Sequence, residues 1–172
     1  SIVTSHGGVS ETIEDRRNKG WGKVSAIQAI LSEVDMGSRL LLRKAILVSS
    51  LLFTTETWSG LKETQLKRLE QVDQSLLRSL MDCHSKVPVE FIHMESGTLK
   101  LRHILTMNRM MYHHHILTSD ENETIVKMYS KLKSDPSRDD WYELLKKDFE
   151  FVGLTIKKEE IRLKEEEHKK EI

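Results

Sequence analysis

Three consecutive histidines, His113, His114 and His115, are the residues of this sequence best suited by type to bind a metal ion or transfer a proton. The surrounding apolar pattern predicts a helix over 98–117, and successive residues of a helix point roughly 100° apart. The three imidazoles therefore cannot converge on one ion, and no carboxylate lies three or four residues away to complete a ligand set. We expect one of them to pack near the core and two to lie at the surface.

Other chemistry is equally hard to place. Metal-dependent hydrolysis would need His103 or the histidine run to meet a distant carboxylate. Cys83 and His84 are adjacent, whereas catalytic Cys–His pairs come from distant parts of a chain, so we expect an ordinary thiol. No phosphate loop, nucleophile elbow or dinucleotide fingerprint occurs. The sequence therefore predicts no catalytic residue, no metal site and no cofactor for this chain.

Basic residues give a stronger indication. They recur on the faces of several expected helices, and the two N-terminal helices carry the ones most suited to contact phosphates: Arg16, Lys19, Lys23, Arg39, Arg43 and Lys44. Arg16, Lys19 and Lys23 are expected opposite the apolar stripe of their helix. Cations without a base-reading motif fit contacts to a phosphate backbone, which are independent of sequence and sensitive to salt. Ordinary solvating charges are the alternative.

Composition describes a helix-prone chain of one domain, or one domain with an appendage. It has 172 residues, 38% hydrophobic and 31% charged, with no formal net charge. The first 118 residues carry 15 Lys plus Arg against 12 Asp plus Glu, so this part is weakly basic. No apolar run is long enough for a membrane span and no signal peptide begins the sequence, so we expect no membrane partner. The single cysteine fits a reducing compartment, so we expect an intracellular location, nuclear or cytoplasmic.

The predicted fold is all-α, a helical bundle with at most a short N-terminal β-hairpin remnant. Apolar periodicity predicts a series of helices, over 10–34, 40–53, 61–80, 89–96, 98–117, 121–133 and 138–153. The segment 40–53 is nearly all apolar and is expected to be buried on most sides. Pro88 is expected to open the helix at 89–96 and Gly97 to stop it. Residues 157–172 are almost wholly charged, which predicts a solvated helical tail.

Four segments, taken in order, resemble a known family: "VSETIEDRRNKGWGKV", "LLLRKAILVSSLLFTTETW", "QLKRLEQVDQSLLRSLM" and "VPVEFIHMESGTLKLRHILTMNRMMYHHHIL". They are similar to the region after the catalytic palm in reverse transcriptases of LINE-type retrotransposons, which lack long terminal repeats. The similarity covers roughly residues 1–118. It implies the end of the palm at 1–9, a thumb-like bundle to 118, accessory helices over 119–156 and the charged tail beyond.

The resemblance implies a fragment of a longer polyprotein. Its role would be to grip a template–primer duplex, RNA–DNA or RNA, for a polymerase site in the upstream palm and fingers. The parent would be an RNA-directed DNA polymerase using Mg²⁺, but no "YxDD"-like segment occurs here, so this chain alone should not polymerise. An inactive relic or a domesticated piece also fits. The alternative function is a helical protein–protein interaction module with no nucleic-acid role.

Overall fold

The computed structural model describes residues 9–58, 61–120, 123–134 and 140–156. Every regular element in this part of the chain is a helix, with no strand, which confirms the all-α prediction. The expected hairpin remnant falls on residues 1–8, outside the described residues, and Val9 already begins the first helix. The predicted tail at 157–172 also lies outside the described residues.

The chain divides into two compact units. The described residues of unit 1 are 9–54 and 61–105, and those of unit 2 are 55–58, 106–120, 123–134 and 140–156. The division therefore falls inside helix α6 (Leu101–Leu117), and not at residue 118 where the domain boundary was expected. The C-terminal half of α6 joins unit 2 because its side chains pack with later helices: Ile116 shares a core cluster with Trp141.

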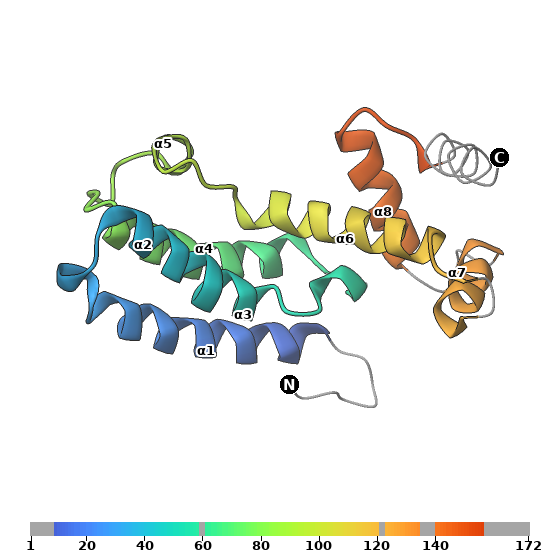
Figure 1. Cartoon of the computed structure of the whole chain (residues 1–172), viewed down its shortest axis with the longest axis horizontal. Helices are drawn as coiled ribbons and strands as arrows, with labels where there is room; N and C mark the ends of the chain where they lie inside the picture. Colours follow the sequence, from blue (N-terminus) through green and yellow to red (C-terminus); the bar gives the residue numbers. More distant parts are fainter. Residues whose placement is uncertain (1–8, 59–60, 121–122, 135–139, 157–172) are drawn as a thin grey trace. The chain divides into compact units, whose positions relative to one another are not determined.

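Unit 1 is built on three long helical segments (Figure 1). Helix α1 (Val9–Gln28) packs along α4 (Glu63–Leu80), and both contact a continuous middle segment. This middle segment begins as α2 (Met36–Leu42), widens into the π-helix η2 (Arg43–Val48) and ends as α3 (Ser49–Leu51). The short 3₁₀ helix η1 (Leu31–Glu33) links α1 to it. Asp35 caps α2 by accepting a bond from the Ser38 amide at 3.1 Å.

Helix α4 supplies the largest share of the unit 1 core. Six residues on one side of this helix are at most 8% exposed: Leu66, Leu69, Val72, Asp73, Leu76 and Leu80. The positions recur at spacings of three and four, which keeps them on one face of the helix. The Gln65 side chain accepts a bond from the Lys62 amide at 2.9 Å, which fixes the start of the helix.

Gly20 allows α1 to lie close to its neighbours. A Cβ atom at this position would lie 2.9 Å from Leu51 Cδ2 and 3.0 Å from Val72 Cγ1. Gly22, two residues on, has open space around it. The first glycine is therefore required by packing, whereas the second is not.

The segment 40–53 is not buried on most sides, so that prediction was wrong. Its inner face is closed, with Leu47 and Leu51 fully buried, but Leu41 is 64% exposed and Phe53 is 65% exposed. The three-helix arrangement covers only one side of this segment, and its remaining apolar residues therefore face outward.

Helix α5 (Val89–Glu95) begins after Pro88, as predicted, and the side chain at this N-cap position makes no capping hydrogen bond. Gly97 follows it with φ +62°, a conformation that favours glycine and ends the helix. Lys100 then pairs with Glu90 at 2.8 Å.

Unit 2 contains the 3₁₀ helix η3 (Thr55–Thr57), the second half of α6, α7 (Thr124–Ser134) and α8 (Asp140–Phe151). Its core is rich in aromatic residues and consists of Ile116, Tyr129, Trp141, Tyr142, Leu145, Phe149 and Ile156. Trp58 is buried, with 8% of its surface exposed. Within the described residues of the whole chain, no helix is long and apolar enough to span a membrane.

Candidate functional site

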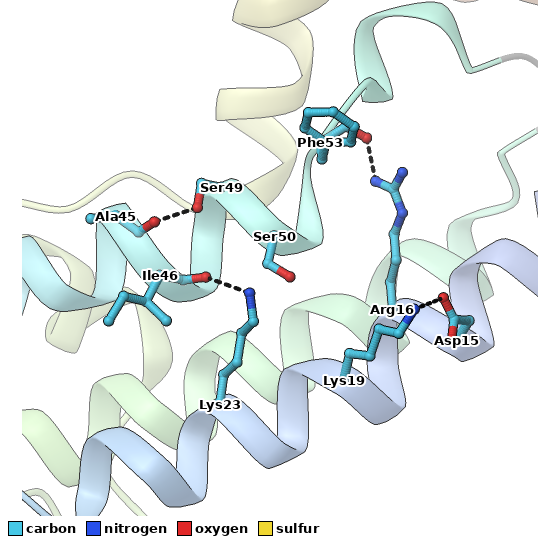
Figure 2. Close-up of a pocket in the computed structure, with 9 residues that line it drawn as sticks. All are labelled: Asp15, Arg16, Lys19, Lys23, Ala45, Ile46, Ser49, Ser50 and Phe53. Atoms are coloured by element: carbon cyan, nitrogen blue, oxygen red, sulfur yellow. Dashed lines mark hydrogen bonds and ion pairs between the residues drawn. The ribbon is translucent and has the colours of Figure 1, made fainter. Parts of the chain in front are cut away.

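An open groove on unit 1 brings together three of the predicted phosphate-contacting residues. It lies between α1 and the η2–α3 segment and has a volume of about 540 Å³. Figure 2 shows the side chains that line it: Asp15, Arg16, Lys19, Lys23, Ala45, Ile46, Ser49, Ser50 and Phe53. Lys23 points toward the η2–α3 segment, Lys19 points toward Asp15, and an exposed phenylalanine lies at one end of the groove.

Lys19 and Lys23 are four residues apart, so both project from the same face of α1 into the groove. Lys19 is 58% exposed and its ammonium pairs with Asp15 Oδ2 at 2.8 Å. A surface pair of this kind is worth little, about 0–1 kcal/mol, and an incoming anion can compete for the lysine.

Lys23 contacts the backbone across the groove. Its ammonium donates to the Ile46 carbonyl at 3.3 Å, as Figure 2 shows. Ile46 belongs to the π-helical η2, and the Ser49 hydroxyl bonds to a second carbonyl of this segment, that of Ala45. The wider π-helical turn shifts the hydrogen-bonding pattern, and π-helical turns are frequent at functional sites. The groove wall therefore offers side-chain donors beside an irregular stretch of helix.

Arg16 lines the groove but does not lie opposite the apolar stripe of α1, so that part of the prediction was wrong. It is 7% exposed and sits within the buried series Ile13, Gly20, Val24 and Ile27. Its guanidinium donates to the carbonyls of Leu51, at 3.2 Å, and Phe53, where the middle segment ends. Arg16 therefore satisfies carbonyls left open at a helix C-terminus.

Arg43 was also predicted to contact phosphate, but it lies in the interior of unit 1 and is bound to protein atoms. The residue is 3% exposed, and its guanidinium holds both carboxylate oxygens of Asp73 at 2.8 and 2.6 Å. A third bond reaches the Leu99 carbonyl at 3.3 Å. Because these contacts occupy the buried guanidinium, Arg43 is part of the core of unit 1.

Arg39 and Lys44 do not line the groove. Arg39 is half-buried and donates to the Val34 carbonyl at 2.7 Å and to the Leu80 carbonyl, at the end of α4, at 3.5 Å. Lys44 is exposed on η2. Of the six predicted residues, Arg16 and Arg43 are buried, Arg39 and Lys23 are half-buried, and Lys19 and Lys44 are exposed. A planar guanidinium can bind several fixed acceptors at once, whereas an ammonium on a flexible stem is readily solvated.

Later arginines follow the same pattern. Arg102 bonds to Glu70 and Glu63, each at 2.9 Å, and so links the start of α6 to α4. In unit 2, Arg109 is 3% exposed and pairs with Asp148 of α8.

The histidine run has the arrangement that the sequence predicts. His113 is fully buried and its Nε2 lies 2.9 Å from the Tyr129 hydroxyl, while His114 and His115 are exposed. Among the residues that the structure describes, no three His, Cys, Asp or Glu side chains come close enough to hold a metal ion. Cys83 is half-buried in the loop after α4.

Two features of the groove escaped the sequence reasoning. The core role of Arg16 was visible in its spacing, three residues after Ile13 and four before Gly20, but a charged residue was assumed to face water. The approach of Ser49 and Ser50 to the α1 lysines joins residues about thirty positions apart, and no local pattern signals it.

Comparison with known proteins adds no relative to this description. No family model matches the chain, and neither a curated protein nor a solved structure is similar to it.

Proposed function

We propose that unit 1 contacts the phosphate backbone of a nucleic-acid duplex through the groove between α1 and the η2–α3 segment. It would act as a thumb-like, non-catalytic module of the LINE-type reverse transcriptases that the sequence resembles. The duplex would be an RNA–DNA hybrid or RNA, held for a polymerase site, with its Mg²⁺, that the palm and fingers of the same polyprotein supply.

A single observation carries the proposal. Lys19 and Lys23 lie one turn apart on one side of an open groove whose other side includes Ser50, while the Ser49 hydroxyl is bonded to the Ala45 carbonyl. Ammonium groups and hydroxyls are the donors that proteins use to bind phosphate oxygens without reading sequence. Arg16 contributes indirectly, because it fixes the end of α3 against α1 and so sets the width of the groove.

The corrected roles of the arginines limit the strength of such binding. With Arg16 and Arg43 bound to protein atoms, the groove can neutralise about two phosphates, through Lys19 and Lys23. Each neutralised phosphate adds roughly 0.9 to the steepness with which log affinity falls against log salt concentration, so this groove would contribute roughly 1.8. This is modest, as expected of a module that works beside other duplex-binding segments.

The test is fluorescence anisotropy of the whole chain with a labelled RNA–DNA hybrid, from low to physiological salt. Replacing Lys19 and Lys23 by alanine should weaken binding equally for all sequences and lower the salt slope by roughly 1.8. The matched control removes two exposed lysines away from the groove, Lys67 and Lys86, with the same change in net charge.

Equal losses in the two variants would show that net charge alone attracts the duplex and would remove the groove from the proposal. If the folded chain without substitutions does not bind the duplex, the nucleic-acid role is rejected.

A protein–protein interaction module is the second candidate, and exposed apolar side chains favour it. Phe91 and Met94 of α5 are 51% and 79% exposed, and Leu99 in the next loop is 51% exposed. Exposed apolar side chains of this size are typical of contact surfaces. Replacing Phe91 and Met94 by serine should leave duplex affinity unchanged, and should weaken association with the upstream palm and fingers if this surface binds them.

A further inference from the structure

Unit 2 contains a second cavity, which the proposed function does not use. Its volume is about 230 Å³, and η3, α6, α7 and α8 all contribute to its lining. Pockets that enclose drug-sized ligands are larger, about 300–1,000 Å³. This cavity is therefore suited to a compact head group or a side-chain end.

Three aromatic side chains line the cavity from three different helices: Tyr112 of α6, Tyr129 of α7 and Trp141 of α8. The rings of Tyr112 and Trp141 meet at 89° with their centroids 6.2 Å apart, so they form a corner. The Tyr129 hydroxyl lies 2.9 Å from His113 Nε2, which holds the third ring in place. Aromatic rings carry negative charge on their faces, and such groups of rings bind organic cations.

The charges around the cavity also favour a cation. Glu56 stands next to Thr57, a lining residue, and its backbone carbonyl accepts a bond from Trp141 Nε1 at 2.6 Å. Burial, and then the nearby Glu56 carboxylate, raise the pKa of the Tyr112 hydroxyl. The described residues that line the cavity include no lysine, arginine, histidine, aspartate or glutamate; beside the three aromatic residues they are Thr57, Ile116, Ile125, Met128 and Leu132.

The same unit already contains one contact between a cation and an aromatic ring. The Lys146 ammonium lies 4.8 Å from the centroid of the Tyr142 ring, at the exposed side of α8. The cavity differs because its rings are half-buried or buried, and a cation there gives up much of its water. A quaternary ammonium is more suitable than a primary one, because its methyl groups cannot donate hydrogen bonds and it is weakly hydrated.

We propose that this cavity binds a quaternary trimethylammonium group, with Tyr112, Tyr129 and Trp141 as its walls and Glu56 as the balancing charge. The end of a trimethylated lysine side chain and the head group of choline share this chemistry. The inference depends on unit 2 alone, so it stands or falls independently of the proposed duplex-binding groove.

The experiment uses the whole chain and ligand-observed NMR titration with a matched pair of probes. Choline carries the trimethylammonium group, and 3,3-dimethylbutan-1-ol replaces its nitrogen by carbon with the same shape. We expect choline to bind at least about tenfold more tightly, because only the cation gains from the ring faces and the carboxylate. Equal affinities would overturn the proposal and leave an ordinary apolar cavity.

Variants locate the binding. Tyr112→Leu should abolish choline binding, whereas Tyr112→Phe, which keeps the ring, should retain it. Glu56→Gln should weaken choline binding several-fold without changing that of the neutral alcohol, since the backbone bond to Trp141 does not depend on the carboxylate. Choline binding that survives both Tyr112→Leu and Glu56→Gln would place the ligand elsewhere and reject the assignment.

A second titration distinguishes the two sources of the group. N-acetyl-trimethyllysine methylamide, compared with the unmethylated lysine compound, reports on a protein ligand. Tighter binding of the trimethyllysine compound than of choline would identify a methylated protein as the source, and the reverse would identify a choline head group. Failure of both cations to bind the folded chain would reject the proposal.

Discussion

The two units each contain a buried arginine–aspartate pair, but they surround it differently. In unit 1, the side chains of Arg43 and Asp73 are 4% and 1% exposed and lie in an aliphatic core. In unit 2, the side chain of Arg109 is 4% exposed but that of its partner Asp148 is 13% exposed, and the core beside them is aromatic. The pair of unit 1 is enclosed by the core, and the proposed binding groove lies at the surface of that unit. Unit 2 instead has a cavity lined in part by its aromatic residues.

Removing the acid of unit 1 should have the largest effect. Asp73→Ala leaves a buried guanidinium without its carboxylate, and we expect the free energy of unfolding to fall by about 3–5 kcal/mol. Urea unfolding followed by circular dichroism measures this loss. Trp21, in α1, provides a fluorescence signal from unit 1.

The double variant Arg43→Met with Asp73→Ala removes both charges and is the control. It should recover much of the lost stability, since no uncompensated charge remains in the core. An equal loss in both variants would show that side-chain volume, and not the charge pair, accounts for the effect.

The corresponding change in unit 2 should cost less. Asp148→Ala removes the partner of Arg109 and the acceptor of the Thr106 hydroxyl, 2.9 Å away. We expect a loss of about 2 kcal/mol, because water can reach the more exposed carboxylate site. Fluorescence of Trp58 and Trp141, both in unit 2, should report it. Glu150→Ala, exposed on the same helix, should change little; a similar loss there would point to α8 as a whole.

Local features of this structure are predictable from the sequence, whereas contacts between distant residues are not. Helix positions and the α4 face depend on local periodicity, which a single sequence displays. The burial of Arg43 depends on Asp73, thirty residues away, and the exposure of Leu41 depends on how many helices surround its segment. Both are tertiary properties, so the sequence alone could not separate the exposed lysines from the buried Arg16 and Arg43.

The two glycines of α1 provide a smaller test of close packing in unit 1. Gly20→Ala should lower the free energy of unfolding by about 1 kcal/mol, because the new Cβ meets Leu51 and Val72. Gly22→Ala should raise it by about 0.5–1 kcal/mol, since alanine favours the helix and meets nothing. Thermal unfolding of the pair measures the difference. Equal stabilisation by both would mean that α1 lies further from its neighbours.

Lowering the pH should slightly reduce the folding stability of unit 1, because it protonates His93, which is 6% exposed. Burial lowers the pKa of His93 most; Asp73 raises it, and Arg43 and Lys100 lower it further. The folded state therefore prefers the neutral imidazole and binds fewer protons than the unfolded state. Stability from this group is fully present above the ordinary histidine pKa, about 6.5, and is lost as the pH falls below that value and through the lower pKa of the folded state.

Melting temperatures at pH 7.5 and 5.5 test this. The parent chain should melt lower at pH 5.5, and His93→Gln should reduce the difference, whereas His114→Gln, at an exposed position, should preserve it. A difference that is unchanged in His93→Gln would assign the acid sensitivity to other groups.

The π-helical segment η2 allows the middle helix to hold extra backbone without turning its two ends relative to one another. A π-helical turn amounts to an α-helix that has accommodated extra backbone. Deleting one residue from its outer side, at Lys44 or Ala45, should therefore restore regular α-helical bonding while Leu47 and Leu51 keep facing the core. A deletion in an α-helical part of the middle segment has no extra backbone to absorb it and would rotate everything that follows by roughly 100°. Over evolution, the outer positions of η2 are expected to tolerate the loss of one residue, whereas α2 and α3 are not.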